Sequence, residues 1–154
     1  LIKINYDNWN IIRIFVVMKK QLKQLDEFQV AYNSTRNSKP TLISEDDYSL
    51  RYKLGKEELD EYLDACKDGD LIEVADALAD QLYILLGTMI SHGMGNVIED
   101  IFDEVHRSNM SKLGEDGKPI YREDGKILKG PNFSSPNLSK FLSDNGQLEL
   151  QLNA

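Results

Sequence analysis

The chain has 154 residues and a formal net charge of −8, with 26 acidic residues against 18 lysines and arginines. This length suits one domain with a sizeable core, and the excess of negative charge argues against a broad nucleic-acid-binding surface. A single cysteine, Cys66, excludes an intramolecular disulfide and a cysteine-based zinc site. A cytoplasmic location is therefore the default expectation.

The first seventeen residues are predicted to be an extension that precedes the domain. Residues 9–17 are apolar but too short to span a bilayer, so no membrane contact is expected. They also lack the small-residue cleavage site of a signal peptide. Met18 then opens an amphipathic pattern that runs to about Asn33 and predicts the first helix. We expect the catalytic domain to cover residues 18–136 and a polar tail to cover residues 137–154.

Three further helices are predicted from apolar residues at helical spacing. One covers about residues 45–66 and has Cys66 on its apolar side, which predicts a buried structural thiol. The next covers about residues 71–91, after a turn with a helix-start signal. From Leu82 to Ile90 it is apolar nearly all round, which predicts burial by neighbours on every side. With a fourth helix at about residues 97–112, the fold class is all-α: a bundle-like domain of four to five helices.

The segment after the fourth helix has a different character. Residues 115–130 contain two Asp-Gly turns around short apolar stretches, a pattern typical of a small hairpin or an irregular flap. Cations gather at the end of the fourth helix and along this flap: Arg107, Lys112, Lys118, Arg122, Lys126 and Lys129. Cations at a helix C-terminus are also ordinary dipole partners. Asn109 lies between Arg107 and Lys112, and its side chain can hydrogen-bond a base edge or cap the helix end.

Carboxylates on the second and third predicted helices form stripes with no cation between them. Residues 68–106 contain neither Lys nor Arg. At about 100° per residue, Glu73, Asp76 and Asp80 lie within about 60° of one another, and so do Glu58 and Glu61. Mutual repulsion and desolvation raise the pKa of such carboxyls, so the group must hold protons or a metal. The alternative is a solvated acidic face, although such a face normally mixes in Lys or Arg.

If the two stripes face each other, they form a cage for one or more divalent cations. Hard oxygen ligands suit Mg²⁺, Mn²⁺ or Ca²⁺, and Mg²⁺ typically shares its coordination shell with substrate phosphates. This donor set fits metal-assisted hydrolysis of a phosphate compound, in which a spare carboxylate orients the attacking water. The basic segment that follows would then receive the phosphates.

The carboxylate pattern resembles the signature of the all-α nucleotide pyrophosphohydrolases, which include MazG-like enzymes and phosphoribosyl-ATP pyrophosphohydrolases. It reads Glu57-Glu58-x-x-Glu61 and then Glu73-x-x-Asp76. Asn109-x-x-Lys112 resembles the Asn…Lys segment that contacts the nucleotide in that superfamily. The likeness covers about residues 18–136 and is greatest to the phosphoribosyl-ATP-pyrophosphohydrolase-like, MazG-related proteins.

This resemblance implies hydrolysis of a nucleoside triphosphate between its α and β phosphates, with Mg²⁺ or alternatively Mn²⁺ as the cofactor. The products would be a monophosphate and pyrophosphate, and the role would be removal of noncanonical or surplus nucleotides. The resemblance also implies a homodimer or a dimer of dimers. The implied catalytic residues are Glu57, Glu58 and Glu61, of which Glu57 is the candidate for water activation. The expected substrate contacts are Arg107, Asn109, Lys112, Arg122, Lys126 and Lys129.

The implied metal ligands are Glu58, Glu61, Glu73 and Asp76, with Asp80 as a further candidate. In many relatives the motif Asp directly precedes an apolar pair and a Tyr, which would match Asp80 and place the motif Glu at Ala77. Either Asp76 or Asp80 can therefore complete the site. Two other functions are also open: phosphoribosyl-ATP pyrophosphohydrolysis in histidine biosynthesis, and a noncatalytic helical module with a structural Ca²⁺ or Mg²⁺.

Overall fold

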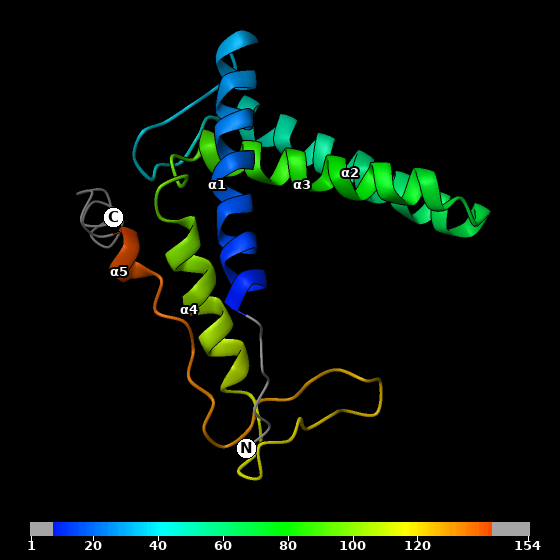
Figure 1. Ribbon diagram of the computed structural model, residues 1–154, viewed down its shortest axis with the longest axis vertical. Coiled ribbons are helices and arrows are strands. Elements are labelled where there is room, and N and C mark those ends of the chain that lie inside the picture. The colour runs from blue at the N-terminus through cyan, green and yellow to red at the C-terminus, as the bar shows by residue number, and fades with distance from the viewer. Residues whose placement is uncertain (1–7, 143–154) are drawn as a thin grey trace. The chain divides into compact units, whose positions relative to one another are not determined.

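A computed structural model describes residues 8–142, with side chains from Met18 onward (Figure 1). These residues form five helices and no strand, which confirms the all-α fold class. The helices are α1 (Asn8–Ala31), α2 (Glu45–Asp68), α3 (Leu71–Ser91), α4 (Ile98–Met110) and α5 (Ser139–Leu142). Contacts divide the chain into two compact units, Leu1–Gly95 and Asn96–Ala154.

The helix boundaries follow the predicted ones closely, with one exception. The first helix begins at Asn8 rather than Met18, so it includes part of the predicted extension. The predicted domain limits, residues 18–136, stay a prediction. Residues 1–7 of the extension and 143–154 of the tail lie outside the described residues.

Helices α2 and α3 form an antiparallel hairpin because the sequence between them ends one helix and starts the next. Gly69 adopts a left-handed conformation (φ 70°), and its N–H donates to the carbonyls of Ala65 and Cys66. The Asp70 carboxylate then caps α3 by accepting from the N–H groups of Ile72 at 2.9 Å and Glu73 at 3.2 Å. The tight turn places the second half of α2 beside the first half of α3 (Figure 1).

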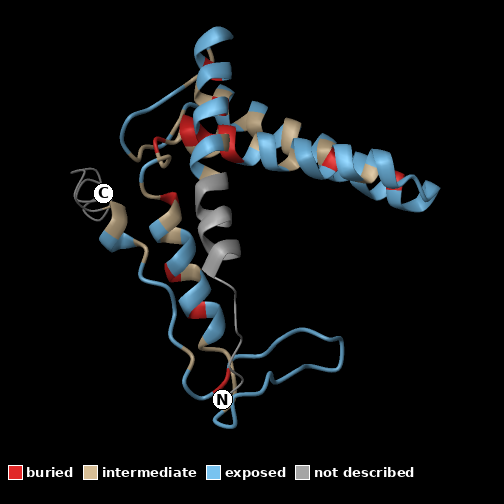
Figure 2. Cartoon of the chain, in the orientation of Figure 1, coloured by how far each residue is buried: buried red, intermediate tan, exposed pale blue. Residues whose placement is uncertain are grey.

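The most buried part of this unit is the contact of α1 with the C-terminal half of α3 (Figure 2). Gln29 of α1 is almost fully buried and donates through Nε2 to the Gly87 carbonyl and the Ser91 hydroxyl, both at 3.0 Å. A Cβ at Gly87 would lie 3.6 Å from the Leu25 side chain, which is an ordinary packing distance, so α1 packs directly against this part of α3. This contact fixes α1 on the end of α3 that is remote from the acidic residues.

Two predictions are wrong: that α3 is buried on every side from Leu82 to Ile90, and that Cys66 is buried. Leu86, Gly87 and Ile90 are buried, but Leu82 and Leu85 on the other side of α3 are 49% and 52% exposed. The reason is that α1 and α2 cover only part of the α3 surface. Cys66 is also exposed rather than buried, although the preceding residue, Ala65, is buried.

By length and composition α3 is the one described helix that could cross a membrane. This is weak support for a span, because the core helix of a water-soluble protein passes the same test. The first half of α3 also carries three of the carboxylates discussed above.

The second unit contains α4, a flap (residues 113–130) and a following segment that we call the strap (residues 134–140). The flap is a minimal hairpin, as one predicted alternative has it: Tyr121 and Ile127 form an antiparallel bridge, and the Leu128 N–H donates to the Ile120 carbonyl at 2.8 Å. Its neck is closed by a hydrogen bond from the Gly130 N–H to the Lys112 carbonyl at 2.9 Å.

Candidate active site

The acidic residues of the predicted site lie on two neighbouring helices of the first unit. Glu57, Glu58 and Glu61 are on α2, and Asp76 and Asp80 are on α3. The alignment of the two helices is fixed at this level by Gln81, whose Nε2 donates to the Glu58 carbonyl at 3.2 Å. The tight turn at Gly69 therefore places the part of α3 that carries Asp76 and Asp80 beside the part of α2 that carries these glutamates.

Glu58 is the most perturbed of these carboxylates. Its Oε2 atom is buried and has no hydrogen-bond partner. The pKa of Glu58 is raised above its ordinary value, first by desolvation and then by the negative charges of neighbouring carboxylates. Those neighbours are Glu61, Asp80, Glu57 and Asp76, in decreasing order of effect. Four of the other five predicted acids thus act on Glu58, whereas Glu73 is not among them.

None of the six acids forms an ion pair within the described part of the chain. Two of the three lysines of α2 are engaged elsewhere: Lys56 pairs with Asp60, and Lys67 pairs with Asp64 at 2.7 Å. The negative charge around Glu58 is consequently not neutralised by the surrounding side chains. A pKa raised by burial and like charges is typical of functional sites.

A divalent cation fits these residues by the chemistry of their donors. Carboxylate oxygens are the ligands that Mg²⁺ and Mn²⁺ prefer. The Oε2 atom of Glu58 has no hydrogen-bond partner, and a bound cation would supply the positively charged neighbour that it needs. As the side chains lie, no three His, Cys, Asp or Glu residues among those described are arranged to hold a metal ion. Glu57, Glu61, Asp76 and Asp80 are all exposed, so their carboxylates can rotate toward a common ion.

The predicted substrate contacts lie in the second unit, and two of them meet at the end of α4. The Lys112 ammonium donates to the Asn109 Oδ1 at 2.7 Å, so the Asn…Lys motif forms one polar group. Arg107, by contrast, is occupied. Its guanidinium donates twice to the Glu104 carboxylate, at 2.9 and 3.0 Å, and once to the Ser135 carbonyl at 3.2 Å. Binding of a phosphate by Arg107 would require these bonds to break.

The three predicted contacts in and beside the flap differ in what surrounds them. Arg122 pairs with Asp124 across the turn at the tip of the hairpin. Lys126 is exposed in the same turn. The Lys129 ammonium lies 4.2 Å from the centre of the Phe133 ring, in cation–π geometry. Lys126 and Lys129 therefore keep their charge available, while Arg122 shares its charge with a carboxylate.

Sequence reasoning missed Glu104, a carboxylate on α4 whose side chain is only 7% exposed. A signal for it exists in the sequence. Ile101, Glu104 and Ser108 are spaced three and four positions apart, so they lie on one face of α4, where Glu104 and Ser108 are buried. Phe102, an apolar residue of the same helix, is 61% exposed.

Comparison with known proteins assigns the family. A solved structure from Exiguobacterium sp. 255-15, provisionally assigned as an NTP pyrophosphohydrolase, is 23% identical, with a TM-score of 0.41 over 89% of this chain and 98% of that one. No curated protein matches the sequence. The model of the phosphoribosyl-ATP pyrophosphohydrolase family matches residues 25–109, more than half of the chain, and includes all six acidic residues. The chain belongs to this family and is a hydrolase that acts on pyrophosphate bonds.

Proposed function

We propose that this enzyme hydrolyses a nucleoside triphosphate between the α and β phosphates in the presence of Mg²⁺, or alternatively Mn²⁺, and releases a monophosphate and pyrophosphate. The observation that supports this most is Glu58, whose buried carboxylate oxygen has no partner and whose neighbours are four further carboxylates. Such an uncompensated cluster costs folding free energy, so it fits a binding site for a cation better than a structural role.

Each acid has a proposed role. Glu58, Glu61, Asp76 and Asp80 would hold the cation, and Glu73, one turn before Asp76 on the same helix, is the remaining ligand candidate. When bound, the cation neutralises phosphate charge and lowers the pKa of an attacking water. Glu57 would accept the proton of that water on its carboxylate.

At the end of α4, Lys112 and Asn109 are proposed to bind the nucleotide. The Lys112 ammonium is a charged donor for phosphate oxygens, and it is already held beside the Asn109 amide. Lys126 and Lys129 would add positive charge from the flap side of the same unit.

A second copy of the chain is the proposed partner. Leu59 and Leu63 of α2 and Leu78, Leu82 and Leu85 of α3 are each about half exposed. Apolar surface of this extent on two adjacent helices favours coverage by another subunit. A homodimer or a dimer of dimers would supply it, and analytical ultracentrifugation tests this directly. A monomer at micromolar concentration would contradict the proposal.

The test of activity is release of pyrophosphate with Mg²⁺ or Mn²⁺ from a panel of dNTPs, NTPs and phosphoribosyl-ATP, with the product nucleotide identified in the same run. Monophosphate plus pyrophosphate from a nucleoside triphosphate supports the proposal. Turnover of phosphoribosyl-ATP alone would favour the second candidate function, phosphoribosyl-ATP pyrophosphohydrolysis, which is the activity in the name of the matching family. Metal binding without turnover of any compound would indicate a noncatalytic module.

A further inference from the structure

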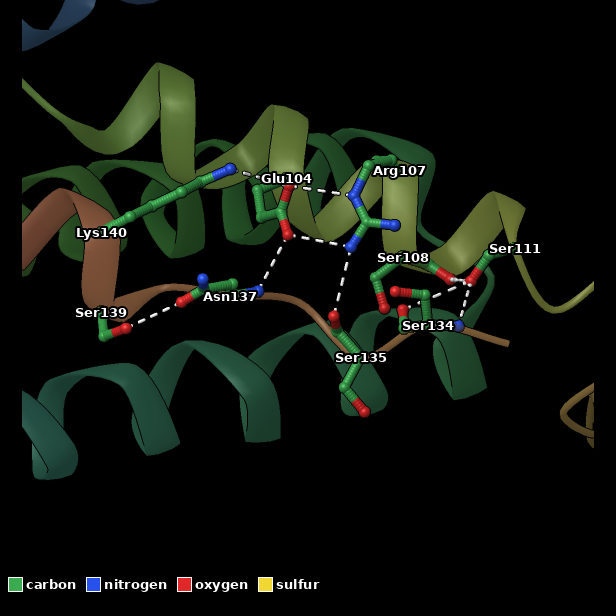
Figure 3. A network of polar contacts seen from close by, with 9 residues as sticks. All are labelled: Glu104, Arg107, Ser108, Ser111, Ser134, Ser135, Asn137, Ser139 and Lys140. Carbon is green, nitrogen blue, oxygen red and sulfur yellow. Dashed lines mark hydrogen bonds and ion pairs between the residues drawn. The ribbon is translucent and has the colours of Figure 1, made fainter. Parts of the chain in front are cut away.

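The strap is fastened to α4 through Glu104 (Figure 3). The Glu104 carboxylate is nearly buried. It accepts four hydrogen bonds: two from Arg107, one from the Asn137 N–H at 2.8 Å, and one from the Lys140 ammonium at 3.2 Å. Two of these four donors belong to the strap. A residue of α4 thus binds a segment that begins about thirty residues later in the chain.

Two more contacts fasten the strap along the same face of α4. The Ser134 N–H donates to the Ser111 hydroxyl at 2.9 Å, and the Arg107 guanidinium donates to the Ser135 carbonyl at 3.2 Å. Because residues 104, 107 and 111 are spaced at three and four positions, they lie one above another on the helix. The strap therefore follows α4 over almost two turns, as Figure 3 shows.

These contacts end where the proposed nucleotide-binding group begins. Lys112 follows Ser111 directly, and its carbonyl also accepts the Gly130 N–H at the neck of the flap. Gly130 must be a glycine for this, since a Cβ there would lie 2.3 Å from the Leu113 carbonyl oxygen. The last turn of a helix frays when its ends are not held, and here the strap and the flap neck hold it.

We propose that Glu104 is a positioning residue: by clasping the strap onto α4, it fixes the last helical turn and so keeps Lys112 and Asn109 in the geometry that binds the nucleotide. This rests on the proposed function. The strap and the flap lie beyond residues 25–109, which the family model matches, so the clasp joins a matched helix to a segment outside the match.

A carboxylate suits position 104 because all four hydrogen bonds that the side chain forms are accepted from donors. Glutamine has nearly the same shape but replaces one acceptor oxygen by an N–H₂ group. In Glu104→Gln that group would face one N–H of Arg107 together with either the Asn137 N–H or the Lys140 ammonium, and at least two bonds would be lost. The substitution consequently tests charge and bonding while leaving side-chain volume unchanged.

The experiment is hydrogen–deuterium exchange of the full chain in wild type, Glu104→Gln and Asp103→Asn, followed by steady-state kinetics of the same three proteins. Asp103 is an exposed carboxylate next to Glu104 on α4 and serves as the matched control. In Glu104→Gln we expect strap peptides with the Ser134 and Asn137 amides to exchange at least about tenfold faster, with peptides of α2 and α3 unchanged. KM for the nucleotide should rise severalfold while kcat changes less.

Lys140→Gln removes one donor from the half-exposed side of the clasp and covers the case in which Glu104→Gln does not fold. A smaller acceleration in the same strap peptides is expected. Unchanged strap exchange in both variants overturns the clasp, and faster exchange with an unchanged KM overturns the positioning role. Absence of turnover in wild type overturns the proposed function and the positioning role with it, whereas exchange still decides whether the clasp exists.

Discussion

Glu58 in the α2–α3 hairpin and Glu104 on α4 are two carboxylates in opposite environments. One oxygen of Glu58 is buried without a partner and its neighbours are carboxylates, so its pKa is raised. Both oxygens of Glu104 accept hydrogen bonds, from Arg107 first and then from Asn137 and Lys140, and its pKa lies well below the ordinary value. The same functional group is destabilised in one unit and stabilised in the other.

The difference separates binding from structure. A carboxylate that has donors on every side needs nothing further and contributes to the fold. A carboxylate that lacks them costs stability, and a protein retains such a group where a ligand or a reaction uses it. On this basis we propose that the hairpin carries the chemistry and that α4 with its strap supports it.

The largest effect is expected from Glu58→Gln. Loss of a metal ligand should lower turnover by at least about 100-fold. Loss of a residue that only orients a metal ligand already lowers activity by about 10- to 100-fold, and loss of the ligand itself should cost more. The melting temperature of the metal-free protein should not fall, since the variant removes the carboxylate that desolvation and four neighbouring charges destabilise. Asp60→Asn on the same helix, paired with Lys56 and directed away from the cluster, is the control and should keep turnover within about twofold. A comparable loss in both variants would contradict the role of Glu58.

Glu61→Gln is expected to abolish turnover as well, while the helical circular dichroism stays unchanged. Glu61 is exposed, so little packing depends on it. Its charge is the first among the neighbours that raise the pKa of Glu58. Turnover at the wild-type level in this variant would remove Glu61 from the site.

Lys112→Ala should have a smaller and more selective effect. The variant loses a charged donor for phosphate, so KM should rise by about tenfold or more. Binding of Mg²⁺, measured by calorimetry without nucleotide, should stay near the wild-type value because Lys112 belongs to the other unit. Equal loss of both would mean that Lys112 supports the fold instead.

The smallest effect is a difference in pH dependence. The pKa of Glu58 is raised in the folded state, so metal-free wild type should lose stability relative to Glu58→Gln as pH rises from the ordinary carboxyl value through the raised one. The pKa of Glu104 is lowered, so its contribution is present above the ordinary value of 4.5 and is lost as pH falls below it. Thermal unfolding across pH checks both signs, and saturating Mg²⁺ should cancel only the first.

Much of this arrangement could be predicted from the sequence because it depends on local signals. Gly69 and Asp70 are local signals for the turn between α2 and α3, and this turn places the acidic residues of the two helices side by side. The exposure of Leu82 and Leu85 could not be predicted. The helical pattern shows that these residues are apolar, but it does not show which other helices cover them.

Glu104 was missed for a different reason. Its two strap partners come from more than thirty positions later in the chain. A charged residue within an apolar helical spacing indicates a buried carboxylate only when its donors are known, and a distant loop supplies them here. The bond from Arg107 to Glu104 was missed for the same reason, and Arg107 stays a predicted substrate contact.

The most direct test of the acidic cluster as a metal-dependent catalytic site is the Mg²⁺ dependence of pyrophosphate release, measured for wild type and Glu58→Gln after both are treated with a chelator. We expect no turnover without metal, saturable recovery in wild type as Mg²⁺ is added, and little recovery in Glu58→Gln at the same concentrations. Equal turnover of the two proteins across the titration, or full wild-type turnover without metal, would contradict the account.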